Sequence, residues 1–362
     1  MTPARDKVHW AAVSLALALC ACGGDEGASE PKPSAAHGEQ IWVVNTGSMS
    51  ISVVDHASKA VIDTIAVGEK PHGQAPASTG DRVYVTTDGD RGEVIAVDAG
   101  TRKVLWRIEA GERLNEPHLT RDDRFLFAPD LLAGNVVVVD VGAGQVTDEI
   151  TLTRPGTTEL LVALHNTYAS HDGLRMYVTA ILSQSIAEID VASHEVLRVI
   201  ALSGEPRPAV ITSDDRKMYV QLSLLHGFVE LDLETGTETR KIEWPDPGTR
   251  PPGYDLGELP TLCHGIGITP DESELWAASN VEGNVRVYSL PGLEEQAVIQ
   301  VGTLPNWIAF SRDGSTAYVT NTDPAAPNGT LSVIDVASRE VVATLDVGVA
   351  PKRVHRVDAH PQ

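Results

Sequence analysis

Cysteine is scarce in this sequence. Only Cys20, Cys22 and Cys263 occur among 362 residues, and the first two lie in an N-terminal segment that has the features of a cleaved export signal. If that segment is removed and Cys22 is modified, Cys263 is the single free thiol, so an intramolecular disulfide is excluded. A haem attached through a Cys-x-x-Cys-His motif is excluded for the same reason. Stability must therefore come from the burial of apolar side chains.

Positive charge is also in short supply. Lys and Arg number 28 against 50 Asp and Glu, which leaves a formal net charge of −22. Binding to nucleic-acid phosphates needs a basic surface, so no nucleic acid is expected as a partner. A long apolar run is missing as well. The stretch from Ala11 to Leu19 is about half of the roughly twenty residues that a membrane-spanning helix requires.

The N-terminus predicts export. Arg5 and Lys7 precede the apolar stretch, which ends in small residues at a cysteine, and this order is typical of a secretory signal peptide. Leu19-Cys20-Ala21-Cys22 resembles the lipobox of bacterial lipoproteins, in which a small residue stands directly before the modified cysteine.

The lipobox resemblance implies a lipoprotein signal peptide over residues 1–21 and a lipid anchor on Cys22. It places the protein in the cell envelope, periplasmic or associated with the outer membrane, with membrane contact through the N-terminal lipid only. Cleavage near Ala21 without a lipid is the alternative. Residues 22–37 contain mainly Gly, Ser, Pro, Ala and acidic residues, which predicts a disordered tether.

An internal repeat organises the rest of the chain. Seven apolar runs recur with steps of 43, 42, 50, 42, 57 and 46 residues, a period that suits a β-propeller blade of four short strands. Six end in aspartate and one in serine: Ile51–Asp55, Val94–Asp98, Val136–Asp140, Ile186–Asp190, Phe228–Asp232, Val285–Ser289 and Leu331–Asp335. Helical periodicity is absent. The sequence therefore predicts an all-β fold, a seven-bladed β-propeller over residues 38–362.

An aromatic residue marks the second strand expected in each unit: Trp42, Tyr84, Phe127, Tyr177, Tyr219, Trp276 and Tyr318. Several continue as Tyr-Val-Thr, including Tyr318-Val319-Thr320-Asn321, and Val-Gly-x-x-Pro occurs at Val67–Pro71, Val301–Pro305 and Val347–Pro351. On these residues the sequence resembles the YVTN-repeat β-propeller family over about residues 38–358. The chain begins at a second-strand position and ends at a first-strand position. We therefore expect the N- and C-terminal strands to close the last blade together.

Polar residues recur where each first strand should enter the mouth of the central channel. Counting twelve residues back from each aromatic marker gives a ring that we expect to bind a ligand: His72, Asn115, His165, Arg207, His264, Asn306 and, from the C-terminal strand, Lys352. In the third unit an alternative register replaces Asn115 with His118. A polar ring favours a wet, open channel mouth over an apolar plug.

Histidines gathered around one axis are candidate ligands of a transition metal, because imidazole is the commonest metal ligand. The candidates are His72, His165 and His264, with Cys263 as a thiolate. No paired metal-binding spacing supports them, so no cofactor is expected, and a lining without metal is the preferred interpretation. A Pro- and Gly-rich insertion from Trp244 to Pro260 should enter on the same face and contribute Arg250, Tyr254 and Asp255.

Two functions remain open. No nucleophile with a partnered base is recognisable, which favours a non-catalytic binding or scaffold protein, expected as a monomeric domain. Its partner would be a protein, a glycan or a small molecule at the channel mouth. The YVTN resemblance implies the alternative, because relatives include lactone-hydrolysing enzymes and propeller subunits of periplasmic oxidoreductases. In that case the channel histidines would serve as ligands or acid–base groups, and Arg207 would hold an anionic substrate.

Overall fold

The computed structural model describes residues 38–251, 254 and 261–358, all within the second of the chain's two units, Ala36–Gln362. The predicted signal peptide, tether and lipid anchor at Cys22 lie outside the described residues, as does Asp255. Within the described part, no helix has the length and apolar character needed to cross a membrane.

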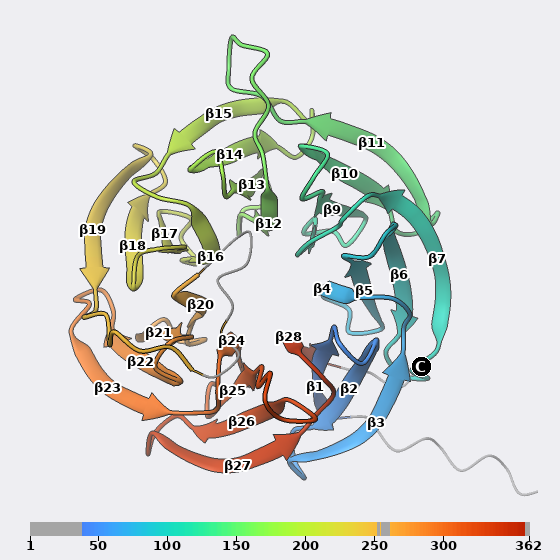
Figure 1. The fold of residues 1–362 in the computed structure, drawn as a ribbon. Coiled ribbons are helices and arrows are strands. Elements are labelled where there is room, and N and C mark those ends of the chain that lie inside the picture. Colours follow the sequence, from blue (N-terminus) through green and yellow to red (C-terminus); the bar gives the residue numbers. More distant parts are fainter. Residues whose placement is uncertain (1–37, 252–253, 255–260, 359–362) are drawn as a thin grey trace, which may run out of the picture. The chain divides into compact units, whose positions relative to one another are not determined.

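Seven four-stranded antiparallel sheets surround a central channel, which confirms the predicted fold (Figure 1). Each sheet is one blade, and its first strand lies innermost. The strands of blades 1 to 3 are β28 (Pro351–Asp358), β1 (Glu39–Asn45), β2 (Ser50–Asp55) and β3 (Ala60–Ala66); β4 (Pro71–Pro76), β5 (Arg82–Thr87), β6 (Gly92–Asp98) and β7 (Val104–Gly111); β8 (His118–Leu119), β9 (Phe125–Pro129), β10 (Asn135–Asp140) and β11 (Gln145–Thr151).

The remaining blades repeat the same order. Their strands are β12 (Leu164–Ala169), β13 (Arg175–Ala180), β14 (Ser185–Asp190) and β15 (Val196–Ala201); β16 (Pro206–Ile211), β17 (Lys217–Leu222), β18 (Gly227–Asp232) and β19 (Thr237–Glu243); β20 (Cys263–Ile268), β21 (Glu274–Ser279), β22 (Asn284–Ser289) and β23 (Glu295–Gln300); β24 (Pro305–Phe310), β25 (Thr316–Asn321), β26 (Thr330–Asp335) and β27 (Glu340–Asp346).

The two chain ends close the ring in one sheet. β28 pairs antiparallel with β1, and Trp42 lies opposite His355 in that pairing. The C-terminal strand is therefore the innermost strand of the blade that the N-terminus begins, as predicted. Neither the inner edge of β1 nor the gap between the first and last blades is left open.

The apolar core lies between adjacent blades. One cluster combines Trp42 and Val53 of blade 1 with Val85 and Ile95 of blade 2, and all four side chains are fully buried. The second and third strands of each blade are covered on both faces, whereas outer strands such as β19 alternate between exposed and half-buried residues. Stacking of β-branched and aromatic side chains between twisted sheets thus replaces a single central core.

Candidate functional site

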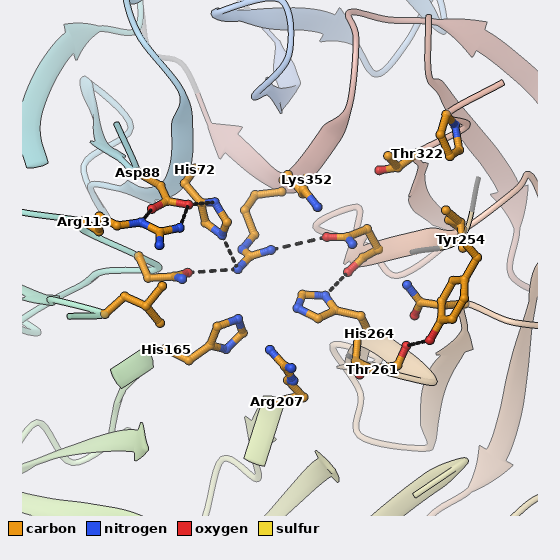
Figure 2. A pocket seen from close by; sticks show the side chains of 17 residues that line it. His72, Asp88, Arg113, His165, Arg207, Tyr254, Thr261, His264, Thr322 and Lys352 are labelled. Atoms are coloured by element: carbon orange, nitrogen blue, oxygen red, sulfur yellow. Dashed lines mark hydrogen bonds and ion pairs between the residues drawn. The ribbon is translucent and has the colours of Figure 1, made fainter. Parts of the chain in front are cut away.

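A cavity of about 390 Å³ opens at one end of the channel. All seven residues of the polar ring line it: His72, Asn115, His165, Arg207, His264, Asn306 and Lys352. His72, His165, Arg207 and His264 point into the cavity from four different blades (Figure 2). We call this cavity the channel-mouth pocket.

A repeated irregularity in the inner strands aims these side chains. In blade 2, Pro71 lies opposite Thr87, but the next pair is Gln74 with Val85, so one extra residue stands beside His72. The same shift occurs at the ring residue of the inner strands β12, β16, β20, β24 and β28. Such a bulge bends the strand and re-aims a side chain, here into the channel.

The threonine of the Tyr-Val-Thr motif supports the bulge. Thr86 accepts a hydrogen bond from the Gly73 amide at 3.2 Å and donates one to the Asn115 carbonyl at 2.6 Å. The hydroxyl therefore pairs a bulged amide of one blade with a carbonyl of the next. The motif residues thus position the pocket as well as filling the core.

The alternative register in blade 3 is wrong. In blade 2, Pro71 pairs with Thr87, which lies three residues after the aromatic Tyr84. In blade 3, Leu114 forms the equivalent bridge to Asp130, which lies three residues after the aromatic Phe127. Asn115 therefore occupies the ring position. His118 lies on β8 towards the other end of the channel, where it lines separate cavities together with His355. The ambiguity arose because β8 spans only two residues.

The three pocket histidines are held neutral. Burial, followed by neighbouring cations, lowers the pKa of His72, His165 and His264 well below the ordinary value. The His264 Nδ1–H group donates a hydrogen bond to the Asn306 carbonyl at 2.8 Å. In the neutral ring, Nε2 is therefore unprotonated and carries the lone pair. His165 Nδ1 is buried without a hydrogen-bond partner among the described residues. Its ring stands perpendicular to that of His264 at 5.5 Å between centroids.

Cationic groups surround these rings. Burial and the neighbouring Arg353 charge lower the pKa of Lys352 to about 8. Burial lowers the pKa of Arg207 to about 10, and its Nε donates to the Ser223 hydroxyl at 2.7 Å. In a protein of strongly negative net charge, the described lining of this pocket thus contains more cationic than acidic side chains.

Arg353 and Glu116 were missed by the sequence reasoning. Arg353 donates from Nε to the Glu116 carboxylate at 2.9 Å and from its terminal nitrogens to Asn115, to His72 and to Asn306. It also lies 4.3 Å from the centroid of the Trp307 ring. One buried guanidinium thus joins four blades and lines the pocket. The adjacent cationic pair Lys352-Arg353 in the closing strand was the available signal.

Asp88 and Arg113 were also missed at the rim. Arg113 donates hydrogen bonds to both carboxylate oxygens of Asp88. Its Nε donates to Oδ1, and its Nη2 donates to Oδ2 at 3.0 Å. Asp88 Oδ2 also lies 3.8 Å from His72 Nδ1. The carboxylate is therefore engaged by a guanidinium of the next blade.

The remaining predicted site residues differ in placement. Tyr254 lines the pocket and donates its hydroxyl hydrogen to the Thr261 carbonyl at 2.5 Å. Arg250 does not line it and instead pairs with Asp246 at 2.7 Å. The Cys263 thiol is buried in an apolar cluster, and this burial raises its pKa. Among residues 38–251, 254 and 261–358, no three His, Cys, Asp or Glu side chains are grouped so as to hold a metal ion.

Similar solved structures share the fold at low identity. The periplasmic gluconolactonase PpgL of Pseudomonas aeruginosa is 17% identical with a TM-score of 0.70, and the match covers 88% of this chain and 99% of that one. Hydrazine synthase of Kuenenia stuttgartiensis is 17% identical with a TM-score of 0.66, over 86% of this chain and 99% of that one. The dihydro-heme d1 dehydrogenase NirN is 17% identical with a TM-score of 0.63, and the match covers 90% of this chain and 77% of that one.

Sequence comparison is more specific. No curated protein matches the chain. The family model described as outer membrane protein assembly factor BamB matches residues 31–242, which is more than half of the chain. By this match the chain belongs to the BamB family of β-propellers.

Proposed function

We propose that this protein is an extracytoplasmic, lipid-anchored β-propeller that acts as a non-catalytic binding protein and holds a small molecule in the channel-mouth pocket. The observation that carries the proposal is the convergence of polar side chains from all seven blades on one cavity. Ligand pockets of this size place a few polar groups to orient a small molecule within a preformed cavity. The bulges supply that preformed geometry here.

The buried ion pair supports binding by fixing part of the pocket lining. The Arg353 and Glu116 side chains are 1% and 0% exposed, and Arg353 lines the pocket while Glu116 holds it from behind. A small molecule that enters the mouth therefore meets a guanidinium whose position is fixed by hydrogen bonds. Asn115 and Asn306, which flank Arg353, add amide groups to the lining.

An extracytoplasmic location follows from the signal-like N-terminus, and two comparisons agree with it. The matching family is described as an outer membrane protein assembly factor, and one structural neighbour is named as periplasmic. We expect Cys22→Ser to move the protein from the membrane fraction to the soluble extract, because the acylated sulfur is lost. Membrane retention of the Cys22→Ser protein would contradict a lipid anchor at this residue.

The binding function is tested with the purified full chain and a library of small polar molecules in thermal unfolding. Compounds that use the pocket should raise Tm for the wild type and lose that effect in His165→Phe, because the phenyl ring lacks the hydrogen-bonding nitrogens and presents an apolar surface to the ligand. Phe125, on β9, is not a lining residue, so Phe125→Leu is a control that should retain binding. If no compound binds, or if binding survives in His165→Phe, the proposal fails and a protein or glycan partner takes its place.

A second candidate function, enzymatic hydrolysis, is favoured by the neutral imidazoles. An unprotonated histidine in a pocket can act as a general base, and one structural neighbour is named as a gluconolactonase. Hydrolysis of glucono-1,5-lactone by the wild type, with loss in the His165→Phe/His264→Phe double variant, would favour this function. Equal rates for wild type and double variant would exclude the pocket as its site.

A further inference from the structure

Among the described residues that line the channel-mouth pocket, cationic side chains outnumber acidic ones. Asp88 is the acidic residue among its described lining residues, and it is already bonded through both oxygens to Arg113. Arg353 has its own carboxylate partner, Glu116. The Lys352 ammonium has no hydrogen bond or ion pair with any described residue.

From this geometry we infer that the channel-mouth pocket selects small oxyanions, molecules with a carboxylate or a phosphate group, and that Lys352 is the ionic partner of that group. This inference rests on the proposed binding function and names its ligand class. It needs neither a metal nor a covalent step. The remaining polar lining would orient the rest of the molecule.

The cost of withdrawing charge from water supports the inference. Lys352 is half-buried, and an ammonium that is partly withdrawn from water without a partner is destabilised, the more so beside other cations. Arg353 and Arg207 both act on Lys352 in this way, and Asp88 offsets only part of the effect. An incoming oxyanion would supply the opposite charge.

A nitrogen of His165 that has no described hydrogen-bond partner is a second, independent observation in favour of a bound oxyanion. His165 is 5% exposed and points into the pocket (Figure 2). Its Nδ1 is buried without a described partner. A buried polar atom normally has a hydrogen-bond partner, so a vacant imidazole nitrogen beside cations suits a hydrogen bond to a ligand oxygen.

The size of the pocket limits the ligand. About 390 Å³ lies near the lower end of the range for small-molecule sites. Asn280, Thr261 and Thr322 also line it and can bond to hydroxyl or amide groups. We therefore expect a compact, polar acid rather than a polymer or a lipid.

The experiment compares matched probes by calorimetry and thermal unfolding of the purified full chain. Succinate is compared with succinamide, and glycerol 3-phosphate with glycerol, so that each pair differs in anionic charge and the two pairs separate carboxylate from phosphate. We expect at least one anion to bind at least tenfold more tightly than its neutral counterpart. Lys352→Met should weaken that binding at least tenfold, and Lys352→Arg should retain most of it. Lys103, between β6 and β7, is exposed and does not line the pocket, so Lys103→Met is the matched control and should bind like the wild type.

The outcomes separate the ligand class from the binding function. If neutral probes bind as well as anions and His165→Phe removes both, the binding function holds and the oxyanion assignment is overturned. The assignment is also overturned if Lys352→Met binds anions like the wild type. If no probe of either charge binds in the pocket, the assignment and the proposed function both fail.

Discussion

Arg353 and Glu116 form an ion pair that is almost completely removed from solvent. The guanidinium Nε lies 2.9 Å from the carboxylate Oε2, and the side chains are 1% and 0% exposed. The other carboxylate oxygen accepts a hydrogen bond from His355 at 2.8 Å. Arg353 and Glu116 are 237 positions apart in the sequence. The pair therefore fixes the closing strand against blade 3 across the channel.

Removing one partner of this pair should be costly. Arg353→Met or Glu116→Gln leaves a buried charge without compensation, for which we expect a loss of about 3–5 kcal/mol in the free energy of unfolding. The double variant should lose less than the sum of the single variants, because neither charge remains.

Urea unfolding of the full chain measures these losses. The exposed pair Arg91–Glu109, with side chains 74% and 61% accessible, is the matched control. Its removal should change stability by less than about 1 kcal/mol. Single variants of Arg353 and Glu116 that unfold like the wild type would contradict the structural role assigned to the buried pair.

The closing strand β28 should be essential for the ring. Deletion of residues 351–362 removes every backbone hydrogen bond between β28 and β1 and leaves an exposed edge. It also removes Arg353 and Lys352. We expect a lower Tm, a broader transition and oligomers in light scattering after gel filtration.

A chain that ends at Asp358 keeps the whole of β28 and is the control for this deletion. It should have the same oligomeric state as the wild type and unfold like it. A monomeric, cooperatively folding 1–350 chain would show that the ring does not need its C-terminal strand.

The repeat made the fold predictable, and constant spacing made much of the pocket predictable. Each unit places its aromatic residue in the second strand and its ring residue twelve positions earlier, so one alignment locates both. Blade 3 was ambiguous because β8 is too short to show its own register. The hub formed by Arg353 depends on the diameter of the channel, which brings distant residues together. Nothing in the local sequence encodes that distance.

Lys352 should reduce stability at neutral pH. Its pKa is about 8 in the folded protein and about 10.5 ordinarily, so between these values the unfolded chain binds more protons. The contribution of Lys352 to the free energy of unfolding therefore rises as the pH increases from about 8 to about 10.5. At pH 7 its full destabilising effect is present. Asp88, Arg207, Arg353, His72 and His264 are the charged and titratable groups that act on it.

Lys352→Met should consequently stabilise the protein at pH 7 by up to about 3 kcal/mol, since one pKa unit corresponds to about 1.4 kcal/mol. The difference from the wild type should shrink as the pH rises towards 10.5. Urea unfolding of both proteins from pH 6.5 to 10.5 measures it, with Lys103→Met as the control that shows no such difference. A Lys352→Met protein that is less stable than the wild type at pH 7 would show that the ammonium has a partner within the protein.

Gly73 controls how closely blades 2 and 3 approach at the pocket. A Cβ atom at this position would lie 2.6 Å from Pro117 Cδ and 2.7 Å from the Asn115 carbonyl oxygen. Neither atom can rotate away, so Gly73→Ala must displace the inner segment of blade 3. Overpacking of this kind costs about 1–3 kcal/mol.

The same displacement should weaken the pocket. Asn115 accepts a hydrogen bond from Arg353 at 3.2 Å, and a shift of its backbone would lengthen that bond and move this part of the lining. We therefore expect Gly73→Ala to lower both the free energy of unfolding and the affinity for any pocket ligand. Gly38→Ala, whose Cβ would meet nothing within 4 Å, should change neither by more than about 0.5 kcal/mol. Urea unfolding and calorimetry measure the two effects, and a Gly73→Ala protein with unchanged stability would mean that blade 3 can move aside without cost.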